Sequence, residues 1–158
     1  MMKILVLGLG NELLSDDGVG ILTARRLRVE LGGQADVVES SLSGISLIEL
    51  FAGHQKAVVI DAVRTGRHPV GSILEFTPDD FGHVLAPSPH YSGLPEILAL
   101  ARQLDVEFPT EIKILAVETA DTTTIGGSLS EPVAAAIAPL TERVVTQVRQ
   151  WRKQESHA

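Results

Sequence analysis

The stretch that decides the fold is residues 1–17, which read MMKILVLGLGNELLSDD. The apolar run from Ile4 to Leu7 is continuous, as is typical of a parallel strand buried on both faces. Two glycines then mark a turn, and Asp16 and Asp17 precede a segment with helical spacing. A buried strand, a glycine turn and a helix in this order predict the first unit of an open α/β sheet.

The rest of the chain alternates strands and helices, without a linker, a repeat or a low-complexity tract. Strands are expected at residues 36–40, 56–60, 72–76 and 112–117, and helices near residues 17–31, 43–52, 94–104 and 130–153. The loop before the strand at 72–76 is too short for a parallel crossover, so this strand should run antiparallel. We predict one three-layer α/β/α domain over residues 1–158, with a five-stranded, mostly parallel sheet and a frayed tail at 154–158.

Composition excludes several classes of function. The net charge of −7 argues against nucleic acid or an anionic membrane surface as the main partner, and favours a cation or a basic protein segment. The absence of cysteine excludes disulfides, thiolate metal sites and a cysteine nucleophile. No run approaches the ~18 apolar residues of a membrane span, and the start lacks the features of a signal peptide. We therefore expect a soluble, cytoplasmic protein.

Acidic side chains stand where the expected parallel strands end. Asp16 and Asp17 follow the first strand, and Glu39, Asp61 and Glu118 end three others. Because the carboxyl ends of parallel strands meet at one edge of a sheet, these acids should lie close enough to repel one another. Either some are protonated or a positive charge lies between them, and a metal ion is one solution.

His90 adds a possible nitrogen ligand. It stands between a proline-rich segment and an expected helix. Together with Asp17 and Asp61, the stronger acidic candidates, it would leave open positions on a transition metal such as nickel, zinc or iron. Glu39 and Glu118 are weaker candidates. The spacing along the chain does not by itself identify this set.

Each candidate also has a structural interpretation. Asp16 or Asp17 could cap the first helix, although only one of them can do so. Asp61 could accept hydrogen bonds from loop amides, and His90 could be a structural or surface histidine. The pair Gly8 and Gly10 begins like a dinucleotide-binding fingerprint, but the third glycine is missing, so a nucleotide-binding domain is a weaker alternative.

Three segments, in order and at matching spacing, resemble the nickel–iron hydrogenase maturation proteases. They are residues 3–20 (KILVLGLGNELLSDDGVG), residues 58–62 (VVIDA), and residues 88–90 (SPH) followed by Gly93 and Leu94. The resemblance extends along nearly the whole chain. It implies a five-stranded mixed sheet with one antiparallel strand, as the loop lengths also predict.

The resemblance implies an endopeptidase that removes the C-terminal extension of a hydrogenase large-subunit precursor after nickel has been inserted. Cleavage would follow a histidine or arginine near the last cysteine pair of that subunit. The family's metal ligands map onto Asp17, Asp61 and His90, which are therefore the predicted catalytic and metal-binding residues. The nickel would be supplied by the substrate. A monomer is expected.

Two loops depart from the family pattern. Residues 39–44 (ESSLSG) stand where the family tends to have an acid, a glycine pair and a threonine, and residues 117–121 (VETAD) lack a proline that is common there. We expect these loops to touch the substrate and to bear on which hydrogenase is processed. A competing hypothesis is a nickel-binding checkpoint or carrier that does not hydrolyse its partner.

Overall fold

A computed structural model of the protein describes residues 1–42, 44–78, 80 and 94–157. In this part of the chain a five-stranded sheet has the order β2-β1-β3-β5-β4. The strands are β1 (Ile4–Leu9), β2 (Asp36–Ser40), β3 (Lys56–Val63), β4 (Ile73–Phe76) and β5 (Glu111–Glu118). All neighbouring strands are parallel except β4 and β5. The predicted mostly parallel sheet with one antiparallel strand is confirmed.

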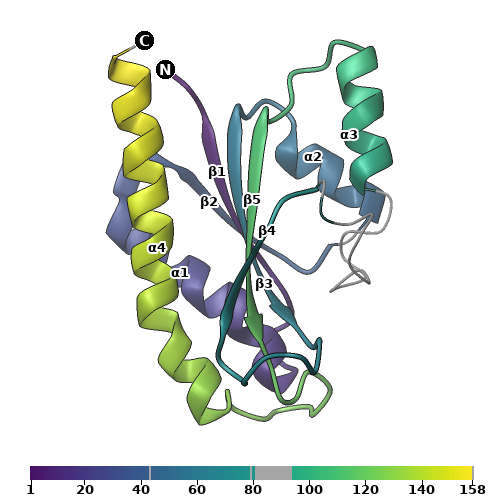
Figure 1. Ribbon diagram of the computed structural model, residues 1–158, viewed down its shortest axis with the longest axis vertical. Helices are drawn as coiled ribbons and strands as arrows, with labels where there is room; N and C mark the ends of the chain where they lie inside the picture. The colour runs from purple at the N-terminus through teal and green to yellow at the C-terminus, as the bar shows by residue number, and fades with distance from the viewer. Residues whose placement is uncertain (43, 79, 81–93, 158) are drawn as a thin grey trace.

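Helices cover both faces of this sheet (Figure 1). They are α1 (Val19–Leu31), α2 (Ile48–Phe51), α3 (Leu94–Gln103) and α4 (Glu131–Ser156), with short 3-10 turns η1 (Ser15–Gly18), η2 (Gly32–Gln34) and η3 (Gly44–Leu47). α1 and α4 lie on one face, and α2 and α3 lie on the other. The predicted three layers are confirmed. Within the described residues, no helix is long and apolar enough to cross a membrane.

Alternating side chains of each strand divide the core into two clusters. Val58 and Ile60 of β3 pack with the apolar stripes of α1 and α4. Ala57 and Val59 pack on the opposite face, with Phe51 of α2 and other residues of that layer. Because successive side chains of a strand point to opposite faces, this alternation also fixes the face on which any later residue of β3 lies.

α1 packs directly on the sheet near the carboxyl ends of β1 and β3. A Cβ atom placed on Gly20 would lie 2.4 Å from the carbonyl oxygen of Leu9 and 2.5 Å from that of Ile60. A Cβ atom on Gly8 would in turn lie 2.4 Å from the carbonyl oxygen of Gly20. Only glycine permits this approach, which fixes the position of the η1 turn just before α1.

Two boundaries differ from the prediction. β3 continues through Val63 because it remains paired with β5 as far as Glu118, so Asp61 lies inside the strand instead of after it. α4 continues through Ser156, so residues 154–156 are helical where a frayed end was expected. The reason is that Glu155 of this last turn accepts a hydrogen bond from the backbone N–H of Met2 and pairs with Arg152.

The close packing of α1 gives a stability prediction. Gly20→Ala should lower the free energy of unfolding by about 2 kcal/mol, because overpacking against two carbonyl groups outweighs the ~1 kcal/mol gain in helix propensity. Gly33→Ala is the matched control, since a Cβ atom there meets nothing within 4 Å. Urea denaturation measures both variants. A Gly20→Ala protein as stable as wild type would contradict this account of the packing.

Candidate active site

The carboxyl ends of the four parallel strands lie at one edge of the sheet, the lower edge in Figure 1. Gly8 of β1 is aligned with Glu39 of β2 on one side and with Ile60 of β3 on the other. On β5, Glu118 is aligned with Val63. The strand register thus brings the acidic positions predicted from the sequence to one edge.

Asp61 is a fully buried carboxylate on β3, with 0% of its surface exposed. Its place in the strand alternation puts its side chain on the same face as Val59, the face covered by α2 and α3. Its Oδ1 accepts a hydrogen bond of 2.8 Å from the backbone N–H of Ala62. Burial of a carboxylate is costly unless hydrogen-bond donors or positive charges compensate it, and this backbone N–H is one such donor.

Asp17 lies in the η1 turn and is half-buried. Its Oδ2 accepts a hydrogen bond of 2.8 Å from the backbone N–H of Asn11, which closes the loop between β1 and η1. Gly10 makes this possible: its φ is +142°, and a Cβ atom there would lie 2.1 Å from the carbonyl oxygen of Asp17. η1 also contacts β3, so Asp17 and Asp61 belong to neighbouring elements at one edge of the sheet.

Asp16 has a different role from its neighbour. It is fully buried, and its carboxylate accepts hydrogen bonds from the backbone N–H groups of Ala120, Asp121 and Ser130 and from the hydroxyl of Ser130. These four bonds attach the η1 turn to the loop between β5 and α4. In the described part of the chain, no side chain caps η1 or α1, so the helix-cap interpretation is wrong for both Asp16 and Asp17.

The two weaker candidates make structural contacts. Glu39 lies 2.9 Å from both Arg25 and Arg28 of α1, on the face of the sheet opposite Asp61. Glu118 is buried and accepts a 2.8 Å hydrogen bond from the backbone N–H of Thr65, as well as one from the Thr65 hydroxyl. Glu39 therefore attaches α1 to β2, and Glu118 holds the loop that follows β3.

His90 lies outside the described residues. The description resumes at Leu94, the first residue of α3, and Leu98 of this helix packs with Leu47 on the face that also carries Asp61. Among the residues that the structure describes, no group of three or more histidine, cysteine or acidic side chains could hold a metal ion. The three-residue set of Asp17, Asp61 and His90 therefore stays a prediction.

Hydrogen bonding keeps two further acids at this edge ionised. The hydroxyl of Thr124, followed by the backbone N–H groups of Thr123 and Thr124, lowers the pKa of Asp121 to about 2. The guanidinium of Arg25 donates to Glu12 and lowers the pKa of that carboxyl below its ordinary value. The charge of Glu12 is thus paired with Arg25, and that of Asp121 is held by donors of its own loop.

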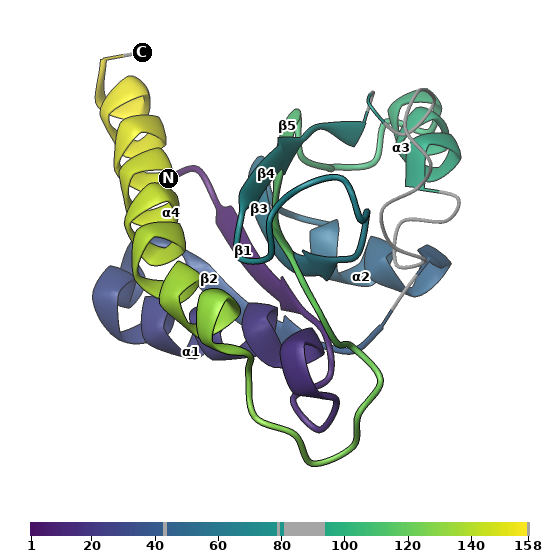
Figure 2. The same ribbon diagram turned by 60° about the horizontal axis from the view of Figure 1, so that its bottom comes forward.

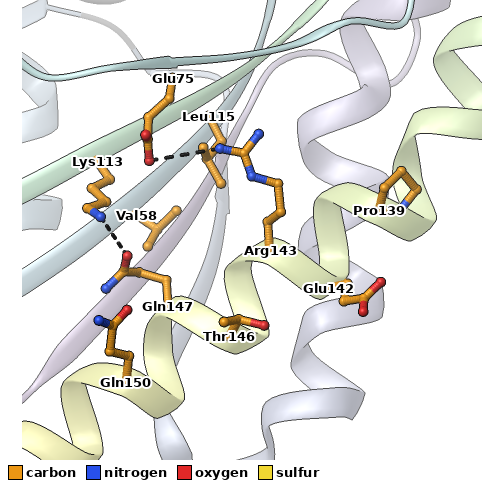
Figure 3. Close-up of a pocket in the computed structure, with 10 residues that line it drawn as sticks. All are labelled: Val58, Glu75, Lys113, Leu115, Pro139, Glu142, Arg143, Thr146, Gln147 and Gln150. Carbon is orange, nitrogen blue, oxygen red and sulfur yellow. Dashed lines mark hydrogen bonds and ion pairs between the residues drawn. The ribbon is translucent and has the colours of Figure 1, made fainter.

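Two cavities differ in where they lie relative to this edge of the sheet. A cavity of about 410 Å³ opens between α4 and strands β4 and β5 (Figure 3). In it, Lys113 donates a 2.7 Å hydrogen bond to Gln147, and Arg143 pairs with Glu75 at 4.0 Å. The described residues that line it include neither Asp17 nor Asp61. A groove of about 330 Å³ does lie at the carboxyl edge, between the loops that follow β1 and β2.

Comparison with known proteins decides the family. The family model for hydrogenase maturation proteases (HycI) matches residues 21–147, most of the chain. The chain belongs to the hydrogenase maturation protease family. It is a hydrogenase maturation endopeptidase, and the resemblance seen in the sequence is confirmed.

Individual relatives agree with this assignment. The hydrogenase 2 maturation protease of Escherichia coli (strain K12) is 29% identical over 155 residues, which cover 94% of this chain and 92% of the relative. HoxM of Azotobacter vinelandii is 31% identical over 143 residues, covering 87% and 68%. The solved structure of the E. coli hydrogenase maturating endopeptidase HybD has 26% identity and a TM-score of 0.77, covering 94% and 93%.

The contrast between the two adjacent acids is testable. Asp16→Asn should lower the free energy of unfolding by about 2–3 kcal/mol, because a buried amide NH₂ would face N–H and O–H donors that now serve a carboxylate. Asp17→Asn should cost less than about 1 kcal/mol, because solvent reaches this half-buried position. Thermal and urea unfolding measure both variants. Equal losses from the two would contradict the distinct roles assigned here.

Proposed function

We propose that this endopeptidase removes the C-terminal extension from the precursor of a nickel–iron hydrogenase large subunit after nickel has been inserted. The observation that carries the proposal is the placement of Asp17 and the buried Asp61 on neighbouring elements at one edge of the sheet, in a chain that belongs to the hydrogenase maturation proteases. The cytoplasmic location and the monomeric state expected from the sequence remain predictions.

In this proposal Asp17, Asp61 and His90 contact the nickel that the precursor brings. Two carboxylates at one edge offer oxygen ligands to a divalent cation, so the precursor that carries nickel binds more favourably than the same precursor without it. The protease would thereby test for nickel before cleavage. His90 is included because it matches the family pattern. In the sequence it also stands four residues before α3, a helix on the face of Asp61.

Cleavage is a hydrolysis in which water adds across one peptide bond of the precursor. The chain contains no cysteine, so a thiolate nucleophile is excluded. Nickel beside the scissile carbonyl would polarise that carbonyl or activate the attacking water. The task of the protease's own residues is then to hold the metal-bearing segment in place, with Asp61 fixed by the strand pairing of β3 and Asp17 fixed by the Asn11 hydrogen bond.

The test is the mass of a hydrogenase large-subunit precursor before and after incubation with the protein. The nickel-loaded precursor should lose a C-terminal peptide, and the nickel-free precursor should not. Asp17→Asn, Asp61→Asn and His90→Ala should each slow the loss at least about 100-fold, because each would remove a contact to the metal worth several kcal/mol in the transition state.

Asp105→Asn is the matched control. It makes the same chemical change at an exposed position, and its φ of 55° is one that asparagine adopts readily. Full processing by all three site variants would contradict the assignment of the residues. A loaded precursor that binds without losing mass would contradict the proposed reaction and favour a nickel checkpoint.

A further inference from the structure

Two large apolar side chains project into solvent at the carboxyl edge of the sheet. Leu13, in the loop between β1 and η1, is 65% exposed, and Ile125, in the loop between β5 and α4, is 82% exposed. The backbone joins these distant segments: Leu14 and Ile125 form an antiparallel bridge, and the N–H of Gly126 donates a 2.8 Å hydrogen bond to the carbonyl oxygen of Leu13. Figures 1 and 2 show the two loops side by side.

Partly buried polar contacts join the two loops. The backbone N–H of Asp16 donates a 2.8 Å hydrogen bond to the carbonyl oxygen of Asp121, and the Ser15 hydroxyl donates a 3.1 Å bond to that of Ser128. The four bonds to the Asp16 carboxylate complete the connection. All of these bonds are made by backbone atoms or small polar side chains, so the loop structure itself does not require leucine or isoleucine at the two exposed positions.

The position of the pair indicates its partner. Leu13 stands four residues before Asp17 in the same loop and turn, and it also borders the groove of about 330 Å³ whose walls include Asn11, Arg25 and Ser40. Any protein that brings a metal ion to Asp17 lies against this loop. An apolar centre surrounded by polar groups is the usual arrangement of a protein–protein interface.

We propose that Leu13 and Ile125 form a docking point for the hydrogenase large-subunit precursor. The pair contacts an apolar patch of the precursor beside its nickel and so aligns the scissile segment with Asp17. This inference rests on the proposed function and adds an attachment that does not depend on the metal. Its physical basis is the removal of two exposed apolar side chains from water, on loops that backbone hydrogen bonds already join.

Val29 provides the matched control. It is 85% exposed on α1, about 15 Å along the helix from the first residue of α1. Valine and serine have similar helix propensities, so Val29→Ser removes exposed apolar surface at little cost to the helix. The comparison therefore separates a local contact from a general effect of surface hydrophobicity.

The experiment measures binding of the nickel-free precursor, which is not cleaved in this proposal, by biolayer interferometry. The double variant Leu13→Ser/Ile125→Ser should raise the dissociation constant at least tenfold at an unchanged Tm, and Val29→Ser should not raise it. With the loaded precursor, the effect of the double variant should fall on KM far more than on kcat.

Three results would overturn the docking proposal. The double variant could bind the precursor as tightly as wild type, or Val29→Ser could weaken binding as much. Light scattering could instead show a wild-type dimer that the double variant abolishes, which would assign the pair to a second copy of the chain. A wild-type protein that binds the loaded precursor but does not cleave it would contradict the proposed function, while the binding comparison would still decide the docking proposal.

Discussion

The buried carboxylate of Asp16 is the interaction on which this edge of the molecule depends. Its four hydrogen bonds join the turn before α1 to the loop before α4, two segments that the chain separates by more than a hundred residues. A buried carboxylate is stable only when donors surround it, so the loop can take few other positions without leaving the charge uncompensated. These hydrogen bonds therefore also fix the position of Asp17, the next residue, at the carboxyl edge of the sheet. The exposed side chains of Leu13 and Ile125 are held by the same contacts.

The strand register fixes the position of Asp61, as the hydrogen bonds of Asp16 fix the position of the η1 turn. Continuous pairing of β3 with β5 through Val63 keeps Asp61 inside a strand, and the alternation of side chains directs it to the face of α2 and α3. The close approach of Gly20 to the carbonyl groups of β1 and β3 sets the distance between the sheet and α1. The sheet and the turn packed against it therefore bring two acids from different parts of the sequence to one edge.

Much of this arrangement is predictable from the sequence. The continuous apolar run of residues 4–7, the short loop before β4 and the alternation of strands with helices are sufficient for the sheet and its layers. The sequence also predicts that acids gather at one edge. It does not separate their roles, because Asp16 and Asp17 differ only in which direction each side chain points, and that depends on a loop far along the chain. Glu39 and Glu118 also end strands and are the weaker candidates in the sequence, and in the structure they bond partners on α1 and in the loop after β3.

We propose that carboxylates of this protease contact the nickel of its substrate. The most direct measurement is the nickel K-edge X-ray absorption spectrum of the loaded precursor, alone and in a complex frozen before cleavage. Nickel should gain oxygen or nitrogen ligands in the complex with the wild-type protein. It should gain none with an Asp17→Asn/Asp61→Asn double variant that still binds the precursor. Identical nickel spectra for the free precursor and the wild-type complex, in a mixture that goes on to cleave when thawed, would contradict the claim.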